Sequence, residues 1–143
     1  MLWHDIIRLL AFMSFDCLRI LAGYFHIMKM YGIPNCGTIQ KARAWLDGRD
    51  IAYTFHDYKK SGIDRERLEK WCQHLGWEKV INRAGMTFRK LPETKKQNLS
   101  ESAAIALMLA QPGMIKRPII ESGERCIAGF DEAVYAAAFG QRV

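Results

Sequence analysis

The feature that most constrains this chain is a short apolar run that ends at a proline and leads directly into a cysteine and a helix. The run covers residues 30–34, and Cys36 follows it after a single asparagine. Beyond it, apolar residues recur at the spacing of one helix face until Gly48, namely Ile39, Ala42, Trp45 and Leu46. The sequence therefore predicts a strand, a tight turn, and a cysteine at the start of a helix.

A cysteine at this position is expected to be reactive. The first backbone N–H groups of a helix have no partner within it, and the helix dipole places partial positive charge there. Such an environment can lower the pKa of a cysteine from ~8.5 to about 3.5–7.5, and the thiolate is the nucleophilic form. The alternative is that Cys36 only fills space, because free cysteine is among the most buried residue types.

Composition restricts the kind of protein. A chain of 143 residues, half of them apolar or aromatic and a quarter charged, is long enough for one domain with a core. Its four cysteines and four histidines form no C-x-x-C pair and no zinc-like spacing, so we expect a reducing cytoplasm and no metal. The net charge of +6 favours anionic partners, but the cations are dispersed, so we expect no direct nucleic-acid binding.

Residues 1–28 differ in character from the rest. They are strongly apolar but contain two acidic and two basic residues, Asp5, Arg8, Asp16 and Arg19. These charges make a membrane span costly and do not fit a signal peptide. Three interpretations stay open: an amphipathic membrane-surface or partner-binding helix, a poor membrane anchor, or an extension that is not part of the working protein. We favour the extension, place the domain at residues 29–143, and expect no membrane contact there.

The remaining patterns predict an α/β protein. The expected elements are a strand at 50–57, a helix from Asp64 to Gly76, short basic helical pieces over 77–99, a helix from Ser100 to Pro112, a hairpin of strands 117–121 and 125–128, and a last helix after Asp131. A strand, helix and strand in succession imply a parallel right-handed unit, to which the hairpin adds antiparallel strands.

Several separated motifs resemble the arsenate reductase (ArsC) family, and within it the YffB/Spx-like branch. They are Tyr31-Gly32-Ile33-Pro34-Asn35-Cys36-Gly37-Thr38, Lys41-Ala42-Arg43-Ala44-Trp45-Leu46, Phe55-His56-Asp57-Tyr58, Leu75-Gly76-Trp77, Arg89-Lys90-Leu91 and Ile115-Lys116-Arg117-Pro118-Ile119-Ile120. The resemblance covers residues 28–143. It implies a thioredoxin-like α/β fold, with a mixed four-stranded sheet, flanking helices and a helical insertion.

The resemblance also implies roles for individual residues. Cys36 would be the nucleophile, Arg83 and Arg117 would hold an anion, and Pro118 would be the cis-proline that faces the cysteine. Three residues of the loop would shape the turn or offer backbone N–H groups to the anion, namely Asn35, Gly37 and Thr38. Taken without the resemblance, these are ordinary turn, helix-start and surface residues.

The chain departs from the family pattern in two regions. Arsenate reductases of this type continue Cys-Gly-Thr-Ser-Arg, whereas here Ile39 and Gln40 follow Thr38, and residues 128–130 lack a further arginine. In Spx-like regulators the second cysteine of a C-x-x-C switch would stand at Ile39. The sequence therefore predicts a monothiol site, which needs an external thiol to complete its chemistry.

From this reasoning we expect a cytoplasmic, monomeric, glutathione-dependent oxidoreductase that reduces disulfides or an oxyanion. Glutathione would be its co-substrate, no cofactor would be bound, and a glutaredoxin could be a partner. One alternative is a true arsenate reductase. The other is a non-enzymatic Spx-like transcriptional regulator that binds the α-subunit of RNA polymerase.

Overall fold

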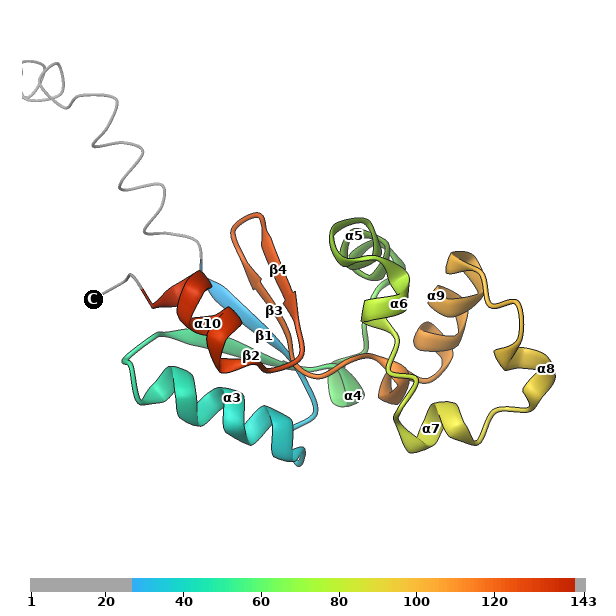
Figure 1. The fold of residues 1–143 in the computed structure, drawn as a ribbon, viewed down its shortest axis with the longest axis horizontal. Helices are drawn as coiled ribbons and strands as arrows, with labels where there is room; N and C mark the ends of the chain where they lie inside the picture. The colour runs from blue at the N-terminus through green and yellow to red at the C-terminus, as the bar shows by residue number, and fades with distance from the viewer. Residues whose placement is uncertain (1–26, 141–143) are drawn as a thin grey trace, which may run out of the picture.

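The computed structural model of the protein describes residues 27–140 and contains one mixed sheet (Figure 1). The strand order is β2-β1-β3-β4. β1 (Met28–Gly32) pairs in parallel with β2 (Tyr53–Asp57) and antiparallel with β3 (Ile119–Ser122), which pairs antiparallel with β4 (Arg125–Ala128). The mixed four-stranded sheet expected from the sequence is confirmed. The three interpretations of residues 1–28 concern a segment that lies almost entirely outside the described residues.

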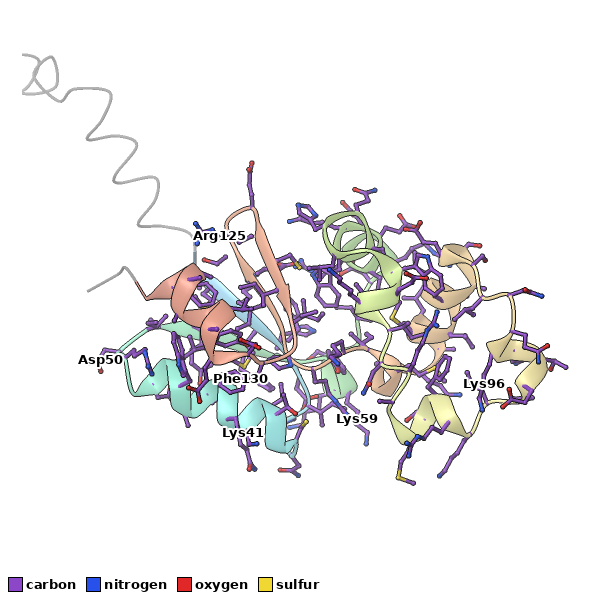
Figure 2. The ribbon with its side chains drawn as sticks, viewed as in Figure 1. Lys41, Asp50, Lys59, Lys96, Arg125 and Phe130 are labelled. Atoms are coloured by element: carbon purple, nitrogen blue, oxygen red, sulfur yellow. The ribbon has the colours of Figure 1, made fainter. Side chains whose placement is uncertain are left out.

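Two helices cover one face of the sheet, α3 (Gly37–Asp47) and α10 (Glu132–Phe139) (Figure 1). The apolar stripe predicted for α3 is buried, and it packs with two methionines of β1 in one core cluster: Ile39, Ala42, Trp45, Leu46, Met28 and Met30. Under α10, Phe130 packs edge-on against Tyr135 with ring centroids 5.0 Å apart (Figure 2). This layer fixes the start of α3 at the end of β1.

The helices between β2 and β3 form a helical lobe beside the other face of the sheet. Its helices are α4 (Tyr58–Ser61), α5 (Arg65–Leu75), α6 (Trp77–Val80), α7 (Met86–Arg89), α8 (Glu93–Lys96), α9 (Glu101–Ala110) and the 3₁₀ turn η1 (Pro112–Met114). The predicted caps of α5 and α9 are confirmed: Asp64 accepts a hydrogen bond from the Arg67 N–H (2.7 Å), and Ser100 from the Ala103 N–H (3.3 Å). Among residues 27–140, no helix is long and apolar enough to cross a membrane.

The helical lobe is joined to the edge of the sheet by a short backbone pairing. The Asn82 N–H donates to the Met114 carbonyl, and the Lys116 N–H donates to the Val80 carbonyl, both at 2.7 Å. Between them, Ile81 and Ile115 form an isolated antiparallel bridge. The chain then passes through the cis Arg117–Pro118 peptide bond into β3, as the resemblance implied.

A polar network buried between α5 and the sheet holds the two together. Glu121 of β3 accepts hydrogen bonds from Trp71 Nε1 (2.6 Å), from Arg67 (2.8 Å) and from the Tyr31 hydroxyl (3.1 Å). Arg67 also donates to the Tyr31 hydroxyl. Burial, reinforced by the nearby Glu121 carboxylate, raises the pKa of Tyr31. Glu121 Oε2 has two donors, whereas Oε1 has Trp71 as its one donor among the described residues, so removal of Trp71 leaves a largely buried carboxylate oxygen unpaired.

Replacement of Trp71 by phenylalanine should destabilise the protein by more than its loss of apolar area explains. The Trp71→Phe variant leaves Glu121 Oε1 without its donor, which typically costs about 1–3 kcal/mol in the free energy of unfolding. Trp45→Phe is the matched control, because Trp45 is also buried, in the other core cluster, and packs against Tyr135 and Arg49 without donating to a carboxylate of the described residues. Urea unfolding of both variants measures the difference, and equal losses would contradict this role for the network.

Candidate functional site

Cys36 occupies the N-cap position of α3. Its backbone is extended (φ −134°, ψ 128°), and its carbonyl accepts the first helical hydrogen bond from the Gln40 N–H at 3.0 Å. The close approach of α3 to the end of β1 requires a glycine at position 32, because a Cβ there would lie 2.3 Å from Ile39 Cδ1. The Cys36 side chain is half-buried, while the neighbouring loop residues Asn35, Gly37 and Thr38 are exposed.

The site favours the thiolate of Cys36. Partial burial by itself raises the pKa of a thiol, but the N–H groups of Ile39 and Thr38, the positive charge of Arg117 and the Thr38 hydroxyl all lower it. The net result is a pKa below the ordinary value for cysteine. These two N–H groups belong to the first turn of α3, where a cap acceptor normally satisfies them. No hydrogen bond from the Cys36 side chain caps the start of α3, so these N–H groups remain available to favour negative charge on the Cys36 sulfur.

Arg117 is the cation that the structure brings to Cys36. It lies at the end of the segment that pairs with Val80–Asn82, directly before Pro118 and the start of β3. Because β3 runs antiparallel to β1, the start of β3 lies beside the end of β1. This segment therefore lies at the same end of the strands as the turn that carries Cys36. Pro118 is buried there, and its carbonyl accepts a hydrogen bond from the Gly129 N–H at 2.7 Å.

Tyr58 is a third member of this site, and sequence reasoning assigned it no role. It is fully buried, and its hydroxyl donates to the carbonyl of Ile115 at 3.2 Å. Burial raises its pKa, the charge of Arg117 opposes this rise, and the charge of Cys36 adds to it. Tyr58 thus ties α4 to the segment that presents Arg117. Its side chain positions that segment. The one sequence signal that could have identified Tyr58 is its place in the motif at residues 55–58.

Arg83 lies in different surroundings from those expected for an anion ligand beside Cys36. Its guanidinium carbon is 5.3 Å from the centre of the Trp77 ring, and its side chain is exposed. It lines a groove that also contains Lys79 and Lys116. Among the charged groups of the described residues, Arg117 rather than Arg83 accounts for the lowered pKa of Cys36. An oxyanion-binding role for Arg83 stays a prediction.

The other described thiols are held in the protonated form. Cys72 is buried, and burial raises its pKa to about 11. Cys126 is half-buried, and burial and then the charge of Glu121 raise its pKa to about 12. Both pack with the helical lobe, whereas Cys36 packs with α3 and α10, and all three are free. Neither is therefore placed as a partner for Cys36. Cys17 lies outside the described residues.

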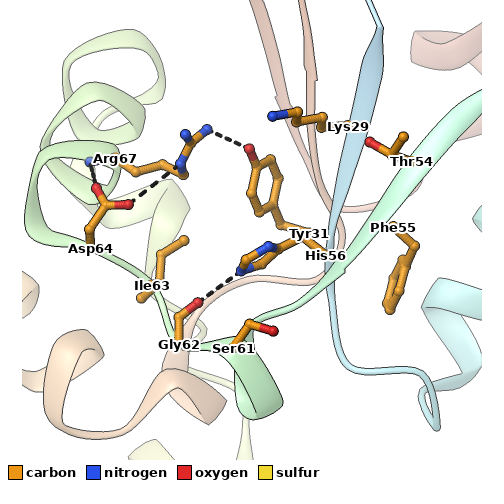
Figure 3. Close-up of a pocket in the computed structure, with 10 residues that line it drawn as sticks. All are labelled: Lys29, Tyr31, Thr54, Phe55, His56, Ser61, Gly62, Ile63, Asp64 and Arg67. Carbon is orange, nitrogen blue, oxygen red and sulfur yellow. Dashed lines mark hydrogen bonds and ion pairs between the residues drawn. The ribbon is translucent and has the colours of Figure 1, made fainter.

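A pocket of about 570 Å³ lies on the sheet face opposite α3, away from the nucleophile (Figure 3). It is lined by Lys29, Tyr31, Thr54, Phe55, His56, Ser61, Gly62, Ile63, Asp64 and Arg67. Its polar groups are largely engaged, since Arg67 bonds Glu121 and His56 Nε2 lies 2.9 Å from the Gly62 carbonyl. Within the described part of the chain, no three His, Cys, Asp or Glu side chains gather to hold a metal ion. We therefore place the candidate site at Cys36.

Several known proteins are similar to this chain in sequence and in structure. The ArsC family model matches residues 31–138. A solved structure described as YFFB is 58% identical, covers 78% of this chain and 97% of its own, and superposes with a TM-score of 0.75. An arsenate reductase (ArsC) related protein of Brucella melitensis is 50% identical, with 79% and 94% coverage and a TM-score of 0.66. The global transcriptional regulator Spx of Streptococcus mutans is 34% identical over 69% of this chain and 73% of its own.

Removal of the Arg117 charge should raise the pKa of Cys36. Since Arg117 stabilises the thiolate, Arg117→Ala should move the pH profile of Cys36 alkylation by iodoacetamide to higher pH. Arg83→Ala is the matched control, because it removes the same charge from a position beside Trp77 and should shift the profile less. Mass spectrometry of the labelled peptide measures each profile. An equal or larger shift for Arg83→Ala would contradict this assignment of the activating cation.

Proposed function

Because the chain belongs to the ArsC family, we propose that it is a glutathione-dependent monothiol oxidoreductase of a reducing, cytoplasmic compartment, with Cys36 as nucleophile. The observation that carries this proposal is the contrast among the described thiols. The pKa of Cys36 is lowered at a helix start beside Arg117, whereas those of Cys72 and Cys126 are raised. Of these three thiols, Cys36 is the one whose surroundings favour the thiolate, and no second thiol of the described residues is placed to resolve it.

The proposed chemistry is a sequence of thiol–disulfide exchanges. The Cys36 thiolate attacks one sulfur of a substrate disulfide, so that a mixed disulfide forms and the other substrate sulfur leaves as a thiolate. A glutathione thiolate then attacks the Cys36 sulfur, releases the second substrate thiolate and leaves a Cys36–glutathione disulfide. A second glutathione, alone or through a glutaredoxin, attacks the glutathione sulfur of that bond. One disulfide is reduced, two glutathiones are oxidised to their disulfide, and Cys36 is restored.

Arg117 and the first turn of α3 have the same physical task in the first and the last of these steps. Whenever Cys36 is the attacking or the leaving sulfur, it carries developing negative charge, and the Arg117 guanidinium and the N–H groups of Thr38 and Ile39 favour that charge. The exposed backbone around Asn35 and Gly37 leaves room for a peptide thiol. We expect the enzyme to act as a monomer without a bound cofactor.

Treatment with oxidised glutathione should produce a single adduct, and it should map to Cys36. Intact-mass measurement of the full chain, followed by peptide mapping, gives both the number and the position of adducts. The Cys36→Ser protein should form no adduct and should lose glutathione-linked reduction of a model disulfide. An adduct on another cysteine, an internal disulfide, or activity retained by Cys36→Ser would overturn the proposal.

A second candidate function is transcriptional regulation, which the similarity to Spx supports. The residue three positions after Cys36 is Ile39, which is fully buried, so a cysteine-pair switch in this loop is absent. A regulator of this kind would bind the C-terminal domain of the RNA polymerase α-subunit without using Cys36. Capture of that domain equally by the wild-type and Cys36→Ser proteins, with no glutathione-linked activity, would favour this candidate.

Arsenate reduction is a related candidate that the similarity to the Brucella protein supports. It requires cations to hold the oxyanion, and in this chain Arg117 is the one that the structure places at Cys36. Arsenate-dependent oxidation of glutathione by the wild-type protein, lost in Arg117→Ala, would favour arsenate as the substrate. Disulfide reduction without arsenate-dependent oxidation favours the oxidoreductase proposed above.

A further inference from the structure

The outer edge of β4 has no strand partner among residues 27–140. β4 pairs with β3 and is the last strand in the order β2-β1-β3-β4. A groove of about 510 Å³ runs along it and includes three consecutive residues of the strand, Cys126, Ile127 and Ala128. In the view of Figure 1, β4 lies between α10 and α6, which contribute Val134 and Lys79 to the walls of the groove.

The register of the hairpin shows which backbone groups face this groove. The Gly129 N–H donates to the Pro118 carbonyl, so this opposed pair is hydrogen-bonded. In an antiparallel ladder, hydrogen-bonded and non-hydrogen-bonded residue pairs alternate. The pairs that Ala128 and Cys126 form with residues of β3 are therefore non-hydrogen-bonded. The N–H and C=O groups of Cys126 and Ala128 therefore point away from β3 and toward the groove. Within residues 27–140, no loop or helix donates to or accepts from them.

The walls of the groove carry mainly positive charge above an apolar floor. Lys79, Arg83 and Lys116 line it, against one carboxylate from Glu78. The floor and rim are apolar, with Leu75, Ile81, Ile127, Ala128 and Val134. Lys116 is held at the end of β4, where its Cε would lie 3.4 Å from a Cβ placed on Gly129. None of these three cations forms an ion pair with an acidic side chain of the described residues.

We propose that this groove binds an extended, acidic segment of a partner protein, which adds a fifth strand to the sheet at β4. An exposed strand edge binds an extended chain through main-chain hydrogen bonds, and side-chain pockets then select its sequence. Here the outward groups of Cys126 and Ala128 supply the hydrogen bonds. The cations select carboxylates, and the apolar floor takes the alternate side chains. A second copy of this chain is disfavoured, because it would bring the same three cations face to face.

This binding is separate from the chemistry of Cys36. In an extended segment consecutive side chains point to opposite sides, and the segment before Pro118 presents Lys116 to the groove and Arg117 to the nucleophile. The Cys36→Ser protein should therefore bind the acidic segment as well as the wild type does. The proposal can fail without affecting the thiol chemistry, and the converse also holds.

The test uses a synthetic peptide of about ten residues with alternating glutamate and valine, a pattern that fits one strand with an acidic and an apolar face. Amide hydrogen exchange of the full chain is followed by NMR. In the free protein, the Cys126 and Ala128 amides should exchange faster than that of Ile127, which is bonded to β3. Peptide binding should slow the exchange at Cys126 and Ala128 and leave Ile127 nearly unchanged.

Three comparisons make the experiment decisive. A Lys/Val peptide of the same length should bind much more weakly, and so should a Glu/Val peptide N-methylated at alternate residues, which cannot pair with a strand. Lys79→Glu should weaken binding of the acidic peptide about tenfold. Lys95→Glu is the matched control, because Lys95 is likewise exposed in the last turn of a four-residue helix but lies outside the groove.

Equal binding of the N-methylated peptide, or binding without slower exchange at Cys126 and Ala128, would overturn strand addition. Equal binding of the Lys/Val peptide, or equal effects of Lys79→Glu and Lys95→Glu, would overturn the charge selection. Failure of every peptide to bind would overturn the proposal as a whole.

Discussion

The site at Cys36 and the groove along β4 both depend on one constraint, the pairing of Val80–Asn82 with Met114–Lys116. Two backbone hydrogen bonds of 2.7 Å join the helical lobe to the segment that enters β3. Because backbone bonds leave little freedom, the side chains that follow are presented in fixed directions. Arg117 reaches the end of β1, near Cys36, and Lys116 reaches the end of β4. Tyr58 adds a side-chain bond to Ile115 in the middle of this pairing.

The chemistry then follows from how the fold treats its thiols. Cys36, Cys72 and Cys126 are all partly or fully buried, and burial raises the pKa of each. Only at Cys36 do a helix start and a cation outweigh the cost of burial. At Cys126 the charge of the Glu121 carboxylate acts in the opposite direction and outweighs that of Lys70. The difference in thiol chemistry is therefore a difference in neighbours, and not in exposure alone.

Sequence reasoning was reliable where the determining interactions are local. The helix starts predicted at Asp64, at Ser100 and after Asp131 depend on contacts within three residues. All three starts are confirmed, and in the structure each of these side chains accepts a capping hydrogen bond. The stripe on α3 and the hairpin of β3 and β4 also follow from short-range patterns. The sequence did not predict the short helix α4, because its cap at Asp57 is followed by only four helical residues.

What the sequence could not show is how distant segments meet. Glu121 joins Trp71, 50 positions away, and Tyr31, 90 positions away, and no periodicity predicts such a network. The positions of Arg83 and Arg117 illustrate the same limit, since both were assigned to one anion site by resemblance alone. In the structure Arg117 acts on Cys36, whereas Arg83 lies against Trp77 in the groove along β4.

That separation bears on how the two regions could act together. A thiolate site with one adjacent arginine discriminates weakly among disulfides, because every disulfide offers it the same sulfur and similar developing charge. Selectivity then has to come from contacts away from the reacting atoms. The groove along β4 is suited to supply such contacts, since it is bounded by the residue that precedes Arg117 and carries unpaired backbone groups. A partner bound there would be held next to Cys36 without changing the environment that sets the pKa of its thiol.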